Sequence, residues 1–163
     1  MRKESLSNGE YYHIYNRGVD RRDVFVDEVD YRRFLTSLRE FNRPDSIGSL
    51  YELSLHETIE GSPTSMEVGL PSSVLVDIVA YCLNPNHYHL IVRQESEKGI
   101  ERFMQKVGTG YTKYFNRRYE RSGPLFGGKF KSVYVDSNEY LLHLSVYVNR
   151  NHRIHGYERS GRI

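Results

Sequence analysis

The chain has 163 residues, which fits one domain with enough length to bury a sizeable core. Hydrophobic residues make up 38% and charged residues 27%, as in globular proteins, and no apolar run approaches the roughly 20 residues of a membrane span. The net charge of +2 excludes no class of partner, but the single cysteine, Cys82, excludes an internal disulfide. Because the N-terminal residues also lack the apolar core of a signal peptide, we expect a cytoplasmic protein with no membrane partner.

The first part of the chain predicts a strand, a basic loop, a helix and an insertion. Residues 10–16 alternate as in a strand, and residues 17–22 form a basic loop that contains glycine. A helix is expected from about Asp27, because acidic residues in a first turn favour the helix dipole. Its apolar residues recur at helical spacing: Val29, Phe34, Leu35, Leu38 and Phe41. Residues 43–73 break this pattern, which predicts a loop insertion within a single domain spanning residues 1–163.

Two histidines stand at the centre of a predicted β-hairpin. The β-branched run 73–83 predicts a strand, and Asn84-Pro85-Asn86 supplies the turn. In the strand that follows, His87 and His89 point to one face, while Tyr88 points to the other and can fill a core. Their Cα atoms are expected about 6.5–7 Å apart, close enough for both imidazoles to hold one metal ion. The same spacing also suits a solvent-facing polar pair, and two ligands alone are an incomplete site.

The second half of the chain predicts two more helices and a strand. Apolar residues at intervals of three and four predict a helix over 97–120, followed by a loop at 122–128 and a strand at 129–135. A capping box of Asp136 and Glu139 begins the last helix. That helix carries Tyr147 and Asn151, which are four residues apart and therefore share a face.

These motifs occur in an order that is familiar. The segment Asn86-His87-Tyr88-His89-Leu90 resembles the histidine–hydrophobe–histidine (HUH) motif of single-tyrosine transposases. Residues 12–18, Tyr-His-Ile-Tyr-Asn-Arg-Gly, resemble the first strand and loop of that family, and residues 114–132 resemble a later block. The segment Tyr147-Val-Asn-Arg-Asn151 resembles the family's catalytic helix. The match extends over most of the chain except residues 43–73 and points to the insertion-sequence transposases and the REP-associated tyrosine transposases.

The resemblance implies both a fold and an activity. The fold is α+β, a ferredoxin-like or RRM-like antiparallel sheet with helices packed on one face. The activity is that of a transposase and endonuclease, which cleaves and rejoins single-stranded DNA near hairpins through a 5′-phosphotyrosine intermediate. Tyr147 would be the nucleophile, and His87, His89 and Asn151 would bind a divalent metal ion. Magnesium or manganese suits the hard oxygen ligands, although imidazoles also tolerate zinc.

Basic residues predict where the DNA is bound. Arginine suits bidentate binding of phosphate, and lysine acts as a point charge. The candidates are Arg17, Arg117, Arg118, Arg121, Lys129 and Lys131. Each of these residues alone could equally be an ordinary solvated surface residue, so the prediction rests on the group.

The chain departs from the family pattern at one position and leaves several alternatives open. The family commonly has proline after the metal-binding Asn, whereas here His152 follows Asn151, so His152 is open as a further ligand. Tyr111 and Tyr114 are the rival nucleophiles. The other histidines, at positions 13, 56, 143 and 155, are assigned to packing or to the surface.

Two other functions are compatible with parts of the sequence. One is a catalytically silent single-stranded nucleic-acid-binding protein of the same descent, against which the presence of both histidines, Tyr147 and Asn151 argues. The other is a histidine-triad metal hydrolase, which is disfavoured because its motif requires another histidine where Ile91 stands. The sequence leaves both a monomer and a homodimer open.

Overall fold

The computed structural model describes residues 6–46, 48, 50, 73–137, 146 and 160–161. Within them the chain forms five strands, two α-helices and one short 3-10 helix. In chain order these are β1 (Tyr11–Arg17), η1 (Val19–Arg21), α1 (Glu28–Glu40), β2 (Val76–Asn84), β3 (His87–Gln94), α3 (Gly99–Arg118), β4 (Lys131–Val135) and β5 (Ser160–Gly161). The predicted last helix over 136–151 and most of the predicted insertion lie outside the described residues.

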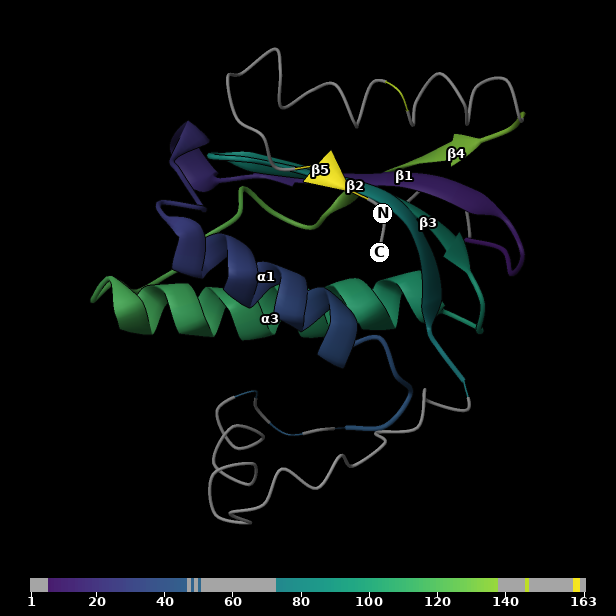
Figure 1. The fold of residues 1–163 in the computed structure, drawn as a ribbon, viewed down its shortest axis with the longest axis horizontal. Coiled ribbons are helices and arrows are strands. Elements are labelled where there is room, and N and C mark those ends of the chain that lie inside the picture. The colour runs from purple at the N-terminus through teal and green to yellow at the C-terminus, as the bar shows by residue number, and fades with distance from the viewer. Residues whose placement is uncertain are drawn as a thin grey trace.

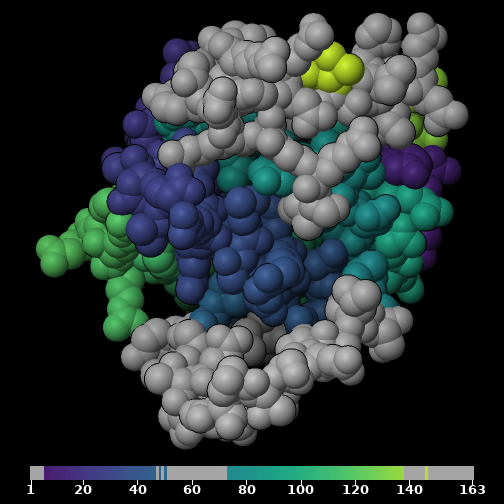
Figure 2. Space-filling model, viewed as in Figure 1, coloured from purple at the N-terminus to yellow at the C-terminus, as the bar shows by residue number. Residues whose placement is uncertain are grey.

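The strands form one sheet in the order β4-β1-β3-β2-β5, and each neighbouring pair is antiparallel. Helices α1 and α3 both lie on one side of this sheet (Figure 1). The succession β1-α1-β2-β3-α3-β4 with this strand order is ferredoxin-like, so the predicted fold class is confirmed. In the space-filling view, the side chains of α1 (blue) lie in front and the end of α3 (green) projects beyond them (Figure 2).

Helix α1 begins where the sequence predicts, because Asp27 caps it. The Asp27 carboxylate accepts hydrogen bonds from the backbone N–H groups of Val29 and Asp30, at 3.0 and 3.2 Å. The predicted apolar stripe is wrong at its first position, since Val29 is 54% exposed. Asp30 points inward instead, because its carboxylate accepts hydrogen bonds from several buried or half-buried groups.

The main core lies between the sheet and the two helices. Alternate residues of the strands, such as Ile14, Tyr88 and Leu90, are buried there against helix residues such as Phe34 and Phe103. The opposite face of the sheet carries a smaller buried cluster: Ala80, Cys82, Ile91 and Val135. Cys82 is fully buried in it and serves as a small hydrophobic residue.

The two helices approach closely at Gly110 of α3. A Cβ atom there would lie 2.7 Å from Cε2 of Phe41, whose ring is buried at the end of α1. Gly108 on the same helix has nothing within 4 Å of the corresponding position. Gly110 is therefore needed for helix packing, although it lowers intrinsic helix propensity. Among the described helices, none is long and apolar enough to cross a membrane.

Candidate functional site

His87 and His89 lie on the face of the sheet turned away from α1 and α3. We call it the histidine face, and it also carries His13 and Tyr15 of β1 and Lys131 of β4. His87 is the first residue of β3, directly after the hairpin turn, as predicted. The rings of His87 and His89 are half-buried, with centroids 5.1 Å apart and planes nearly perpendicular at 86°. The two imidazoles are thus adjacent, as their spacing on a strand requires.

The hairpin turn fixes the position of His87. The carbonyl of Asn86 accepts a hydrogen bond from Gly18 N at 2.8 Å, and the Asn86 side-chain amide donates to the carbonyl of Arg21 at 3.2 Å. This second bond orients the amide so that its oxygen faces His87. Nδ1 of His87 therefore donates to Oδ1 of Asn86, at 2.6 Å, and in neutral His87 the lone pair lies on Nε2. Nε2 is therefore an acceptor nitrogen.

A buried amide stands beside that nitrogen. Nδ2 of Asn84, on the neighbouring strand β2, lies 3.2 Å from Nε2 of His87. Asn84 is only 1% exposed, yet its Oδ1 has no hydrogen-bond partner among the described residues. Burying an unpaired amide oxygen is costly, so a donor group or ion that met Oδ1 of Asn84 would stabilise this side chain, while its Nδ2 faces Nε2 of His87.

His89 is paired with a third histidine. Its Nδ1 lies 2.8 Å from Nε2 of His13, on β1. Strands β1 and β3 are neighbours in the sheet, and the register places Tyr15 directly opposite His89. His13 is 9% exposed, and its burial lowers its pKa to about 4, so its imidazole is neutral at neutral pH.

The residues of the histidine face fit a divalent metal ion, but only in part. In both histidines Nδ1 lies against a polar side chain, so Nε2 is the ring nitrogen that would bind a metal ion, and in His87 it also lies 3.2 Å from the Asn84 amide. Among the described residues, however, no group of three or more histidine, cysteine or carboxylate side chains could hold a metal ion. Two imidazoles therefore need at least one further ligand. Asn151, the third ligand that the resemblance implies, lies outside the described residues, as does Tyr147.

The rival nucleophiles Tyr111 and Tyr114 lie in the helix layer, on the other side of the sheet. Tyr111 is fully buried and donates a hydrogen bond to the carbonyl of Val24 at 2.6 Å. Its burial raises the pKa of its hydroxyl far above the ordinary value. Tyr114 donates to Asp30 at 2.9 Å, and its pKa is also raised, first by burial and then by that bond. Both hydroxyls therefore have structural partners and are poorly suited to attack DNA.

Three of the six predicted DNA contacts lie near the histidines. Arg17 is exposed at the end of β1 and stands opposite His87 in the sheet register. Lys131 is exposed on β4 opposite Tyr15, with Nζ 6.0 Å from the centre of that ring. Lys129 is exposed in the preceding loop, which is held to β1 by a hydrogen bond from the Asn16 side chain to the carbonyl of Gly128.

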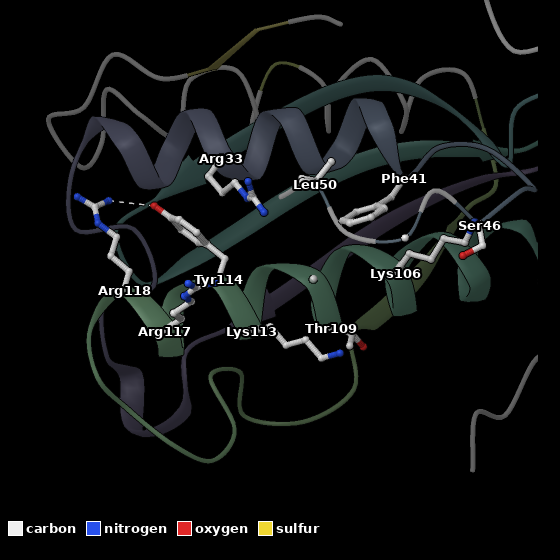
Figure 3. A pocket seen from close by; sticks show the side chains of 12 residues that line it. Arg33, Phe41, Ser46, Leu50, Lys106, Thr109, Lys113, Tyr114, Arg117 and Arg118 are labelled. Atoms are coloured by element: carbon white, nitrogen blue, oxygen red, sulfur yellow. Dashed lines mark hydrogen bonds between the residues drawn. The ribbon is translucent and has the colours of Figure 1, made fainter. Parts of the chain in front are cut away.

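The other three lie at the end of α3, in or beside the helix layer. Arg118 forms ion pairs with Asp27 and with the buried Asp30. Arg121 donates to the Asn116 side chain at 2.6 Å. Arg117 is exposed and, together with Arg118, lines a cavity of about 760 Å³ between α1 and α3 (Figure 3). The structure therefore separates the six predicted contacts into two groups.

Basic side chains line this cavity, but some of them already make contacts within the protein. In Figure 3, Arg33 and Phe41 come from the side of α1, and Lys106, Lys113 and Tyr114 from α3. Nζ of Lys106 donates to three backbone carbonyls of residues 43–45, in the loop after α1, at 2.7 to 3.3 Å. The guanidinium of Arg33 lies 5.1 Å from the centre of the Tyr114 ring.

Two residues of the site were missed in the sequence. His13 was assigned to packing or the surface, and Asn84 was assigned only to the turn. The alternation of His13 and Tyr15 within the first strand was a usable signal, because it gives that strand a polar face. It did not say which other strand that face adjoins.

The chain resembles known transposases in sequence and in fold. The family model described as "Transposase IS200 like" matches residues 67–151. No curated protein matches the chain. The structure of a REP-associated tyrosine transposase bound to a REP hairpin is similar over 96% of this chain and 74% of its own, with 14% identity and a TM-score of 0.57. A structure from Deinococcus radiodurans, assigned as a transposase, covers 92% of this chain and 97% of its own, with 16% identity and a TM-score of 0.48.

Proposed function

The chain belongs to the family of IS200-like transposases, and from this premise we propose that it cleaves and rejoins single-stranded DNA next to hairpins. A protein with a similar fold was solved in complex with a REP hairpin, which supports a hairpin as the DNA partner here. The observation that carries the proposal is the pair of adjacent imidazoles on the histidine face, each with Nδ1 against a polar side chain. Such a pair is arranged to present two Nε2 atoms to one ligand.

We assign the attack on DNA to Tyr147. Its phenolic oxygen would bond to the phosphorus of a backbone phosphate as the bond from that phosphorus to the 3′ oxygen breaks. The phenolic proton passes to solvent, and the leaving 3′ oxygen takes up a proton. The product is a 5′-phosphotyrosine link that keeps a phosphoester bond, so a second 3′-OH can reverse the reaction and rejoin DNA without ATP.

Tyrosine needs help in this role. With an ordinary pKa of about 10, deprotonating its hydroxyl costs roughly 4 kcal/mol at neutral pH. A bound Mg²⁺ or Mn²⁺ ion supplies Lewis acidity, which polarises the scissile phosphate. His87, His89 and Asn151 would hold that ion, and the sequence places Asn151 four residues after Tyr147. Ligand and nucleophile on one expected helix would keep the attacking oxygen in line with the phosphate.

Arg17, Lys129 and Lys131 are the residues that we assign to the strand being cut, because they are exposed near the histidines. Arg117 and Arg121 stay predicted contacts for a part of the DNA farther away. Arg118 is the weakest candidate, since two carboxylates already surround it. Lys131 and Tyr15 together offer a cation and an aromatic ring, a combination that suits an unpaired base and its phosphate.

A covalent-capture assay tests the proposal. The protein is mixed with end-labelled hairpin DNA that carries single-stranded flanks, with Mn²⁺ or Mg²⁺, and is run on a denaturing gel. We expect a protein–DNA adduct in the wild type that is lost with chelator, in His87→Ala and in Tyr147→Phe. Tyr15→Phe is the matched control, because Tyr15 is the described tyrosine in ring contact with His89. An adduct that survives Tyr147→Phe but is lost in Tyr15→Phe would contradict the assignment.

A further inference from the structure

His13 and His89 meet edge to edge. Their ring planes differ by only 20°, and the 5.1 Å between ring centroids is much longer than the 2.8 Å between His13 Nε2 and His89 Nδ1. Two nearly coplanar rings that meet through nitrogen atoms form a hydrogen bond, not a stack. The bond joins β1 to the strand that carries both predicted metal ligands.

This bond has two forms, and only one suits metal binding. A neutral imidazole carries one proton, so one nitrogen of each ring donates and the other accepts. If His13 Nε2 donates, then His89 has its proton on Nε2 and has no lone pair there for a metal ion. If His89 Nδ1 donates, then Nε2 of His89 carries the lone pair.

We propose that His13 is a positioning residue for His89: its Nε2 accepts the proton on His89 Nδ1 and so holds Nε2 of His89 ready to bind a divalent metal ion. This inference rests on the metal-assisted function proposed above. His13 would do for His89 what Asn86 does for His87, since Oδ1 of Asn86 accepts the Nδ1 proton of that ring at 2.6 Å. The two ligands would then have matching supports on two different elements, the turn and β1.

Tyr15 also contacts His89 on the histidine face, but through its ring and not through a hydrogen bond. Tyr15 lies against the same ring of His89, with centroids 6.0 Å apart and an interplanar angle of 25°, which is a stacking contact. Tyr15 also lies against His13, with centroids 5.1 Å apart. A variant at Tyr15 thus changes the packing of both rings while leaving the nitrogen–nitrogen bond, which makes it a matched control.

The test uses the full chain and two readouts that do not depend on DNA cleavage. The first is the ¹⁵N NMR spectrum of the metal-free protein, which reports which ring nitrogen of His89 carries the proton. The second is the dissociation constant for Mn²⁺ from calorimetry, with His89→Ala defining which binding belongs to this site. His13→Phe removes the acceptor and keeps a ring, His13→Gln keeps an acceptor, and Tyr15→Leu is the control. Circular dichroism of each variant verifies that it folds.

We expect protonated Nδ1 in wild-type His89, and loss of that preference in His13→Phe. The affinity for Mn²⁺ should fall about 10- to 100-fold in His13→Phe, recover at least partly in His13→Gln, and stay within about threefold in Tyr15→Leu. If His13→Phe does not fold, the test rests on His13→Gln. The proposal is then contradicted if this variant has His89 protonated on Nε2 and binds Mn²⁺ weakly. Wild-type affinity in a folded His13→Phe also overturns it. A wild type that binds no Mn²⁺ would overturn the metal-assisted function itself, and with it the role given to His13.

Discussion

Nη1 of Arg118, at the end of α3, lies 2.7 Å from Oδ1 of Asp30 in α1. Asp30 has no exposed surface, and its two oxygens also accept hydrogen bonds from Val26 N and from the hydroxyls of Tyr114 and Tyr119, at 2.8 to 2.9 Å. One carboxylate thus joins the start of α1 to the last turn of α3. A structural role therefore falls to Tyr114, Tyr119 and Arg118, the last of which is also one of the six predicted DNA contacts.

Asp30→Ala should destabilise the protein by about 3–5 kcal/mol, because it removes a fully buried carboxylate and leaves several donors without their acceptor. Urea denaturation followed by circular dichroism measures this change. Arg32→Gln is the control on the same helix, since the Arg32–Glu28 pair is exposed and should contribute no more than about 0.5 kcal/mol. A loss for Asp30→Ala as small as that of the control would show that the carboxylate does not hold the two helices together.

Asp27 should make the stability depend on pH in the acidic range. The hydrogen bond from Arg118 is the main cause that lowers the pKa of Asp27 below its ordinary value of 3.8. A lowered pKa means that the folded state favours the ionised carboxylate, so its contribution is complete above about pH 4 and is lost as the pH falls further. Asn at this position still caps the helix, so Asp27→Asn isolates the charge.

The measurement is the urea midpoint of wild type and Asp27→Asn between pH 7 and pH 3. We expect the wild type to be the more stable at pH 7, with a constant difference down to about pH 5 that narrows below about pH 4. A difference that widens towards pH 3 would mean that the sign of the pKa shift is wrong.

Two glycines of α3 should respond to alanine in opposite directions. Gly108→Ala should stabilise the protein by about 0.5–1 kcal/mol, since helix propensity improves and the added methyl meets nothing. Gly110→Ala gains the same propensity but places Cβ 2.7 Å from the buried Phe41 ring, so a net loss of about 1–3 kcal/mol is expected. Thermal unfolding compares the two variants directly, and equal stabilisation of both would exclude close helix packing at Gly110.

Single-stranded DNA should bind on the histidine face and not on the helix layer. Each phosphate contact on a single strand contributes about 0.7 to the slope of log affinity against log salt concentration. The double variant Arg17→Gln, Lys131→Gln should therefore lower that slope by about 1.4 for an unpaired oligonucleotide. The matched variant Arg32→Gln, Lys113→Gln, which removes two exposed charges from the helix layer, should leave it nearly unchanged. The slopes are measured by fluorescence anisotropy. A lower slope for the helix-layer variant only would show that the single-stranded DNA binds on the helix layer.

Local patterns were sufficient for most elements of the fold. The turn at residues 84–86 was predicted because proline fixes φ and asparagine tolerates the unusual dihedrals of a turn, and the structure has a turn at residues 85–86 where Asn84 pairs with His87. The start of α1 near Asp27 was predicted from acidic residues that favour the helix dipole, and the structure adds that Asp27 caps the helix. Val29 was wrongly predicted to lie on the buried face of the helix. The spacing of apolar residues does not show that the polar Asp30 has enough hydrogen-bond donors around it to be buried.

The pairing of His13 with His89 could not be predicted from local sequence patterns. The two residues are 76 positions apart, and their contact depends on the sheet order and on the register between β1 and β3. The division of the basic residues between two layers was hidden for the same reason, because α3 carries Arg117 and Arg118 away from the sheet. Residue types pointed to the chemistry, while long-range topology decided which of them meet.

Locating the covalently bound DNA on the protein would show directly whether Tyr147 is the nucleophile. The covalent adduct is trapped with Mn²⁺, digested with nuclease and protease, and the modified peptide is fragmented in a mass spectrometer. We expect a nucleotide remnant on Tyr147 and on no other tyrosine of the fourteen in the chain. A remnant on Tyr15, or on any other tyrosine, would contradict it.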